Sequence, residues 1–297
     1  MRDLVTWNGY PAPVRHECPL PTGVCKFDFP FLKKVYCFSS YDLTSNIDAS
    51  HLFHGLAHAP NLDDLAISCT NLRSEPLVSP VVALKRYAFH HWDPGGNVTL
   101  SESSGWSRPL SSSLASLQSF ELTIRDQNEL IECDFTSMLS RGVSFPQLEI
   151  LSLSMSFDHR FDSFIPLLVL CPRVQDLTIS VDAHGQPFLP PFGRLINMLP
   201  NSVALKRLTI GLRMWNIYYQ LMAPSILENE SFDRSLAILI RSFSVQALRS
   251  FRVVTNNELL QAFEFSRVSE ACRSRRITFG VEGHPSPGMT VWEMPLL

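Results

Sequence analysis

The sequence lacks any long apolar run. No stretch approaches the roughly 18 to 20 unbroken apolar residues of a membrane-spanning helix, and the most apolar segment, residues 164–171, is far shorter. The first 30 residues hold no apolar run of signal-peptide length, and prolines interrupt them from residue 11 onward. We therefore expect an intracellular protein, cytoplasmic or nuclear, without a membrane partner.

Neither sign of charge is in large excess, and the linear motifs of common enzymes are missing. Lys and Arg number 25 against 28 Asp and Glu, a formal net charge of −3, so no nucleic acid partner is expected. There is no G-x-x-x-x-G-K-[ST] or G-x-G-x-x-G for phosphate binding and no G-x-S-x-G nucleophile elbow. We expect no cofactor and no enzymatic activity.

Cysteine is sparse, and its pattern is not that of a disulfide or zinc framework. The seven cysteines are odd in number, and no two of them form a C-x-x-C pair. Because we expect no secretion signal, we interpret the cysteines as reduced thiols, several of which act as small buried apolar residues. Hydrophobic residues make up 45% of the chain and charged residues 18%, which is typical of a packed globular protein.

One pattern recurs along the chain, namely P-x-[LV]-x-x-[LV]-x-apolar. Complete copies span residues 30–37, 60–67, 146–153 and 172–179, weaker copies without the proline span 84–89, 117–122, 205–210 and 248–253, and Ile277 and Phe279 form a last half-copy. A single copy means little in a leucine-rich chain. Ordered copies with a shared upstream proline indicate an internal repeat.

The second apolar residue of each copy serves as a marker of the repeat. The markers are Val35, Leu65, Tyr87, Phe120, Leu151, Leu177, Leu208, Phe251 and Ile277. Their mean spacing is about 30 residues, close to the 20–29 residues of leucine-rich repeats. Apolar residues at the marker and two positions later share one face of a strand. We expect Leu65, Leu151, Leu153, Leu177 and Ile179 to be buried.

The segments between the copies have helical periodicity. Residues 47–58, 129–141, 160–170 and 258–275 carry apolar residues at three- and four-residue steps, and the shared prolines would end such helices before the next strand. Parallel strands also need crossovers of a dozen or more residues. Residues 29–282 are therefore predicted to form an α/β fold, a single right-handed leucine-rich-repeat solenoid. It would be horseshoe-like, with a concave parallel sheet and helices on the convex side.

Four segments do not fit the repeat. Residues 1–28 are rich in proline and are interpreted as an N-terminal segment or cap, and residues 283–297 as a C-terminal tail. Residues 92–113 are predicted to form an exposed loop. Residues 215–242 are predicted to form a second insertion, with two helices around Pro224.

Three phrases carry a family resemblance: A-P-N-L-D-D-L-A-I at residues 59–67, F-P-Q-L-E-I-L-S-L at 145–153 and C-P-R-V-Q-D-L-T-I at 171–179. They resemble the degenerate leucine-rich repeats of F-box proteins, particularly the fungal ones, and the resemblance covers roughly residues 29–280. It implies the substrate-recognition region of a ubiquitin-ligase receptor, which binds a protein partner of unknown identity.

Two features depart from that family. An asparagine usually stands five positions after the marker, but here only Asn256 does, which predicts an uneven solenoid. Residues 1–28 are too short and too rich in proline to form an F-box, the helical module that docks a Skp-type adaptor, so no direct adaptor binding is expected. The alternatives are a ubiquitin-independent scaffold, or an enzyme with a site at residues 90–93.

A group of histidines is a candidate for metal binding. His51, His54 and His58 share one side of a predicted helix, opposite its apolar residues. A metal would need a fourth ligand, for which Asp48 is the nearby candidate. We interpret the group as a solvated polar face and predict no metal site.

Two further polar groups are candidates for chemistry. His90, His91 and Asp93 follow a predicted strand, but no nucleophile motif accompanies them, so a polar strand end is the simpler interpretation. Arg273, Arg275 and Arg276 form a basic cluster that is narrower than a nucleic-acid footprint. We interpret this cluster as a solvated helix end.

The alternation of the strands defines a possible binding face. Residues one position before the marker, and one and three positions after it, face away from the core. The predicted partner-binding residues on this face are Tyr36, Phe38, Asp64, Arg86, His90, Glu121, Asp176, Arg207 and Arg252, because Tyr and Arg are enriched among binding hot spots. The alternative is that residues 1–28 cover Tyr36 and Phe38 as a cap. We expect a monomer.

Overall fold

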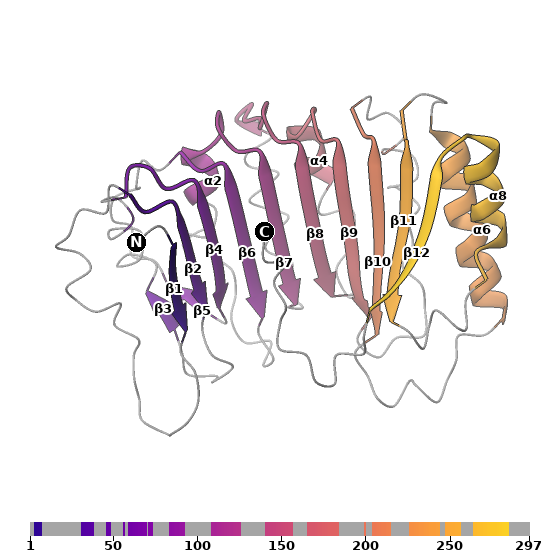
Figure 1. Cartoon of the computed structure of the whole chain (residues 1–297), viewed down its shortest axis with the longest axis horizontal. Helices are drawn as coiled ribbons and strands as arrows, with labels where there is room; N and C mark the ends of the chain where they lie inside the picture. The colour runs from indigo at the N-terminus through magenta and orange to yellow at the C-terminus, as the bar shows by residue number, and fades with distance from the viewer. Residues whose placement is uncertain are drawn as a thin grey trace, which may run out of the picture. The chain divides into compact units, whose positions relative to one another are not determined.

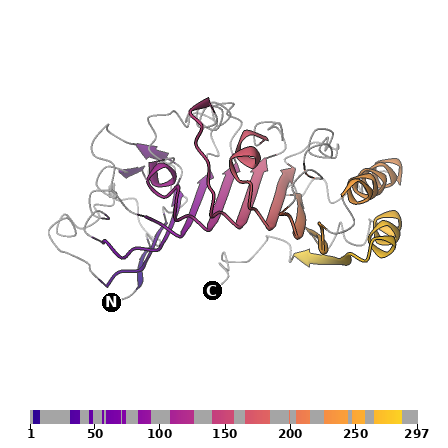
Figure 2. The same cartoon turned by 90° about the horizontal axis from the view of Figure 1, so that it is seen from above.

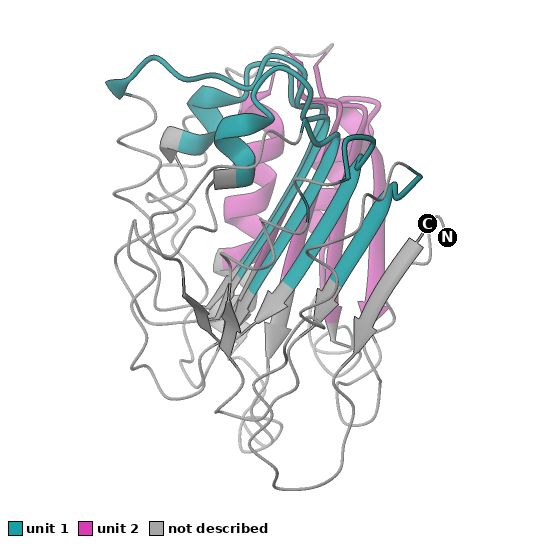
Figure 3. Ribbon diagram, turned by 90° about the vertical axis from the view of Figure 1, so that its left-hand side faces the viewer, with its two compact units in different colours: residues 1–174 teal, residues 175–297 magenta. Residues whose placement is uncertain are grey.

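The structure is a computed structural model that describes residues 3–7, 31–38, 46–48, 56, 59–69, 71–73, 83–92, 108–125, 140–156, 165–183, 199, 204–214, 226–243, 247–256 and 264–284. The chain divides into two compact units, residues 1–174 and residues 175–297 (Figure 3). Both units combine parallel strands with few helices in their described parts. The predicted α/β class with a parallel sheet is therefore confirmed.

The described part of the first unit contains six parallel strands that lie side by side in sequence order (Figure 1). They are β1 (Asp3–Trp7), β2 (Lys34–Phe38), β4 (Asp64–Cys69), β6 (Arg86–Trp92), β7 (Ser119–Arg125) and β8 (Ile150–Ser156). A short parallel pair, β3 (Asn46–Asp48) and β5 (Asn71–Arg73), forms a separate sheet. Helices α2 (Arg108–Ser112) and α4 (Ile165–Leu170) lie on one face of the main sheet (Figure 2).

In its described residues, the second unit contains four parallel strands and two helices. The strands lie in the order β9 (Asp176–Ala183), β10 (Arg207–Met214), β11 (Ser250–Asn256) and β12 (Thr278–His284). Helix α6 (Ile226–Ser242) connects β10 to β11, and α8 (Ser266–Ser274) connects β11 to β12. The two helices pack side by side (Figure 1).

The register of the strands aligns the apolar markers. One row crosses β2, β4, β6, β7 and β8 at Val35, Leu65, Tyr87, Phe120 and Leu151, and another crosses β9, β10 and β11 at Leu177, Leu208 and Phe251. These markers are all buried, as are Leu153 and Ile179 two positions after theirs. The predicted burial of Leu65, Leu151, Leu153, Leu177 and Ile179 is therefore confirmed.

The last marker predicted from the sequence is wrong. Phe251 pairs with Phe279 rather than Ile277, and the two rings stack with centroids 6.0 Å apart. The difference arises because α8 ends in a tight turn, in which the Ile277 N–H donates to the Cys272 carbonyl over 2.9 Å. Arg276 has a left-handed φ of 58° in this turn. Ile277 thus completes the end of the helix, and the strand begins after it.

At six places in the described residues, a single backbone carbonyl joins the start of one strand to the start of the next. The Lys33 carbonyl accepts the N–H groups of Asp63 and Asp64, over 2.9 and 3.1 Å. The same two-donor junction recurs at the carbonyls of Asp63, Lys85, Gln118, Gln175 and Lys206. Each acceptor stands two positions before a marker. The junction therefore fixes the register in which the next strand can pair.

The prolines of the repeat lie in tight turns before the strands. Pro60, Pro146 and Pro172 each occupy the second position of a four-residue turn. Each turn is closed by the N–H of its fourth residue and the carbonyl of its first, in the pairs Leu62–Ala59, Leu148–Phe145 and Val174–Cys171. Proline fixes the φ that this position prefers and has no N–H to leave unpaired. Both ends of each turn are buried, so the turn is anchored in the core.

The predicted exposed loop over residues 92–113 is wrong at both ends. Trp92 is the last residue of β6, and α2 follows within the segment with Leu110 buried. Ser113 Oγ accepts the N–H of Leu84 over 3.0 Å, and Ser116 Oγ donates to the Leu84 carbonyl over 2.8 Å. These hydroxyls hold a turn that lacks the proline of the complete copies. Residues 93–107 lie outside the described residues.

Three other predicted boundaries change. The helix predicted over residues 47–58 does not begin there, because Ile47 lies in β3 and pairs with Leu72 of β5. The segment 1–28, interpreted as an N-terminal segment or cap, contributes the unpredicted strand β1, which pairs with β2. The tail predicted over residues 283–297 begins later, because Gly283 and His284 belong to β12.

The described helices otherwise fall inside the predicted helical segments. Helix α4 lies within residues 160–170, α8 within 258–275, and α6 within 215–242 after Pro224. Ser140 is helical at the end of the segment predicted over 129–141. The second helix predicted before Pro224 lies outside the described residues.

Helices α6 and α8 satisfy each other's ends. The buried carboxylate of Asp233 on α6 accepts the N–H groups of Arg267 (3.0 Å) and Val268 (2.9 Å) in the first turn of α8. The residue before α8, Phe265, provides no side-chain cap of its own. In return, the Arg275 guanidinium donates to the carbonyls of Arg241 and Phe243 at the end of α6. Unpaired backbone groups at both helix ends are thereby satisfied.

Replacing a marker should destabilise the protein far more than replacing its neighbour on the other face. Leu151 is 0% exposed and Ile150 is 46% exposed. We expect Leu151→Ala to lower the free energy of unfolding by about 2–5 kcal/mol, through lost burial and a new cavity. Ile150→Ala should change it by less than about 1 kcal/mol. Urea denaturation measures both, and similar losses would contradict the register.

Candidate functional site

Alternate residues of the strands form a face directed away from the apolar rows. This outer face comprises the positions one before each marker and one and three after it. In the first unit it lies opposite α2 and α4 (Figure 2). Most of the described side chains on it are partly or fully exposed, in contrast to the marker rows. The predicted partner-binding residues whose side chains are described lie at these alternating positions.

Asp64 is the centre of one polar cluster on the outer face. Tyr36 Oη donates to Asp64 Oδ2 over 3.4 Å, and Arg86 Nη2 lies 2.8 Å from the same oxygen. The Asp64 side chain is only 12% exposed, whereas that of Arg86 is 39% exposed. A carboxylate withdrawn from water needs charged or donor partners. Asp64 thus holds Tyr36 and Arg86 in defined positions from two neighbouring strands.

A second polar pair lies on the adjacent strands of the same face. His90 Nε2 and Glu121 Oε1 are 4.0 Å apart, which makes an ion pair whenever the imidazole is protonated. Ala66 and Ala88 are register partners and stand between the row of Asp64 and Arg86 and the row of His90. The structure therefore brings together five predicted residues, Tyr36, Asp64, Arg86, His90 and Glu121, around two short side chains.

The outer face of the second unit carries its own cross-strand pairs. Arg207 donates from Nε and Nη2 to the two carboxylate oxygens of Asp176. These hydrogen bonds, together with the charge of Asp176, raise the pKa of Arg207. Arg252 Nη1 lies 3.3 Å from Glu282 Oε1. Glu282 was not among the predicted residues, because its position three after the marker follows only once Phe279 is recognised as that marker.

Gly211 shows how closely two outer-face residues approach each other. It is the register partner of Ser180. A Cβ at this position would lie 2.3 Å from Ser180 Oγ and 2.9 Å from Ser180 Cβ. The absence of a side chain therefore lets the buried Ser180 occupy the space above β10.

Several sequence candidates lie outside the described residues or have no described side chain. Phe38 is at the expected register position, but its side chain is outside the described set, as is that of His91. His51, His54, His58 and Asp93 are not described at all. Among the residues that are described, no group of three or more His, Cys, Asp or Glu side chains could hold a metal ion.

The structure describes the side chains of two cysteines, and both behave as buried apolar residues. Cys171 and Cys272 are free thiols in the core of their units. Burial raises the pKa of Cys272 to about 11 and raises that of Cys171 as well. Both side chains are therefore neutral at physiological pH, and for these two residues the predicted role is confirmed.

Comparison of the chain with protein-family models, with curated proteins and with solved structures found no match. Within the described part of the chain, no helix is long and apolar enough to cross a membrane. Function is therefore inferred from the repeat and from the surfaces of the two units.

The cluster around Asp64 should be more sensitive to loss of one partner than an exposed pair. Arg86→Leu should lower the free energy of unfolding by about 1–3 kcal/mol, because it leaves a mostly buried carboxylate without its cation. Adding Asp64→Asn should recover part of that loss. The control is a double-mutant cycle on Arg252 and Glu282, whose side chains are 51% and 53% exposed. There the coupling free energy between the two residues should be about 0.2–1 kcal/mol. Equal coupling energies in the two denaturation cycles would contradict this view of Asp64.

Proposed function

We propose that the chain is a right-handed leucine-rich-repeat solenoid of the kind found in F-box proteins, and that it binds a partner protein through its outer face without catalysing a reaction. The repeated two-donor junction and the aligned apolar rows support a repeat architecture, since equivalent positions make equivalent bonds. Right-handedness follows the rule that about 98% of parallel crossover connections have that hand.

The observation that carries the proposal is the pairing of charged side chains between neighbouring strands of the outer face. Asp64 fixes Arg86 and Tyr36, and Asp176 fixes Arg207 through a two-bond fork. Side chains held in one conformation lose less entropy when a partner binds. Arg and Tyr are also the residue types that most often dominate binding energy. The outer face thus presents its main anchors in positions fixed before binding.

The chemistry of this face suits a protein surface. Acidic and basic groups alternate across the strands, from Asp64 and Arg86 to His90 and Glu121, with short alanine side chains between them. Such an arrangement offers a partner paired positive and negative contacts, which select for orientation more than for raw affinity. A tyrosine and an exposed Ile150 add the apolar contacts that protein interfaces contain.

Direct measurement of partner affinity tests this proposal. After affinity purification and mass spectrometry identify a partner, Tyr36→Ala with Arg86→Ala should raise Kd at least tenfold, roughly 1.4 kcal/mol. The matched control, Val169→Ala with Arg173→Ala, removes an exposed apolar residue and an arginine from α4 and the turn after it. It should leave Kd unchanged. If the folded outer-face variant binds as tightly as the unmodified protein, the site lies elsewhere.

The role within a ubiquitin ligase can be tested separately. The sequence carries no recognisable F-box, so we expect the chain alone not to bind a Skp-type adaptor. Gel filtration of the two purified proteins should show no shared peak. A stable complex would contradict this expectation and would place an adaptor site on the chain. The result is independent of the outer-face substitutions, so the two tests can fail separately.

A further inference from the structure

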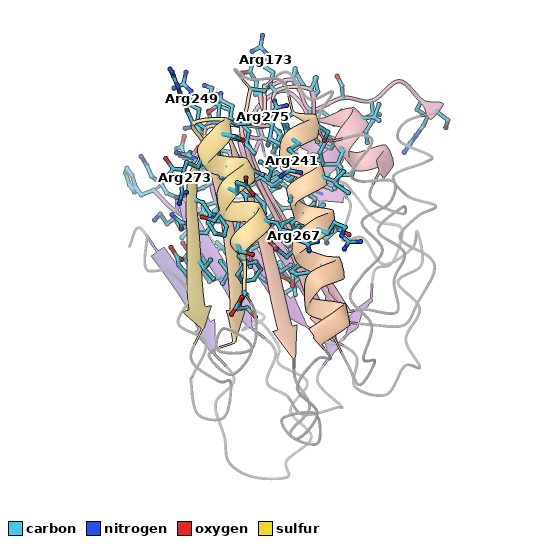
Figure 4. The ribbon with its side chains drawn as sticks, turned by 90° about the vertical axis from the view of Figure 1, so that its right-hand side faces the viewer. Arg173, Arg241, Arg249, Arg267, Arg273 and Arg275 are labelled. Atoms are coloured by element: carbon cyan, nitrogen blue, oxygen red, sulfur yellow. The ribbon has the colours of Figure 1, made fainter. Side chains whose placement is uncertain are left out.

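Five basic side chains gather at the edge of the second unit where its strands begin. We name this group, Lys206, Arg241, Arg249, Arg273 and Arg276, the basic edge. All five are exposed. They come from different segments that backbone bonds hold together, because the Lys206 carbonyl accepts the Arg249 N–H and the Arg249 carbonyl accepts the Thr278 N–H. Figure 4 shows Arg241, Arg249, Arg273 and Arg275 near the ends where α6 and α8 finish.

The side chains of the basic edge are not needed to satisfy the two helix ends. Arg275 already donates to the carbonyls of Arg241 and Phe243 at the end of α6. At the end of α8, the N–H groups of Arg276 and Ile277 bond to the carbonyls of Arg273 and Cys272. The favourable effect of a cation near a helix C-terminus is small for each exposed side chain.

The charge of the basic edge is little offset by its surroundings. Within three residues along the chain on either side of its members, Glu270 is the one acidic residue. Among the described residues, no carboxylate pairs with the four arginines, and Lys206 Nζ bonds to the neutral Gln175 side chain over 2.6 Å. Like charges held close together at a surface repel each other, and that repulsion is relieved when an anion binds.

We infer that the basic edge binds an acidic segment of a partner protein, with Ile238 receiving an apolar residue of that segment. The guanidinium group presents a planar fork of donors that matches a carboxylate with two parallel hydrogen bonds, and four of the five members are arginines. Ile238 is 50% exposed and stands three residues before Arg241, on the same side of α6. The basic edge shares no residue with the outer face, so this inference does not depend on the proposed function.

A protein segment fits these observations better than a nucleic acid. Single-stranded nucleic acids are usually bound with aromatic side chains that stack on the bases, and the one large apolar side chain exposed in the described second unit is aliphatic Ile238. A long phosphate backbone would also extend beyond the edge onto a chain whose net charge is −3. A short acidic segment would contact no more of the surface than the basic edge.

Fluorescence anisotropy on the full chain tests the inference. The probe is a fluorescein-labelled peptide built from glutamate and leucine, and the same peptide with lysine in place of glutamate is the specificity control. The double reversal Arg249→Glu/Arg273→Glu is compared with Lys33→Glu/Arg141→Glu, which makes the same change in net charge at exposed sites of the first unit. Arg249→Gln/Arg273→Gln removes charge without reversing it, and thermal unfolding verifies that each variant folds.

The expected result is saturable binding of the acidic peptide, weakened by added salt. Reversal at the basic edge should weaken it at least tenfold, the glutamine variant should weaken it less, and the control reversal should change it less than twofold. Absence of saturable binding, or equal weakening by both reversals, would overturn the inference. Tighter binding of a short DNA duplex than of the peptide, again lost in Arg249→Glu/Arg273→Glu, would overturn it in favour of a nucleic acid site.

Discussion

The backbone carbonyl just before the start of a strand, where it binds the start of the next strand, is the constraint on which the remaining structure depends. At six described junctions it accepts two consecutive N–H groups of the next strand. A one-residue slip would break both bonds and turn the apolar rows toward solvent, so a local bond and the burial of the core favour the same register. Several of the described strands are preceded by a turn whose ends are buried. The turn carries a proline at its second position, or is held by the hydroxyls of Ser113 and Ser116.

The strand register that aligns the buried rows also aligns the positions of the outer face. Residues at equal positions become neighbours on adjacent strands, where their charges must either pair or repel. The sequence places opposite charges there, as in Asp64 with Arg86 and Asp176 with Arg207. These paired charged side chains therefore stabilise the sheet and at the same time hold one another in a defined orientation. The same residues can serve stability and recognition without conflict.

In the second unit, cross-element contacts also satisfy the backbone groups at the ends of helices α6 and α8. Their ends are satisfied by Asp233 and Arg275, which each reach from one helix to the other. An aromatic series from Phe251 through Phe279 and Phe265 to Phe232 links the last strands to both helices. With the helix ends satisfied internally, the arginines of the basic edge are left exposed.

The sequence by itself determined most of the described strands, their order, their buried rows and most residues of the outer face, because a two-residue alternation with a proline signal is a local property. It did not reveal β1, β3, the position of α2 or the start of β12. Asn46–Asp48 becomes a strand only by pairing with residues 71–73, and the turn that follows α2 is held by serine hydroxyls that contact Leu84. The pairing of Arg252 with Glu282 and the gathering of the basic edge were likewise decided by tertiary structure. Those contacts join residues that are far apart in the sequence, and only the packed chain brings such residues within bonding distance.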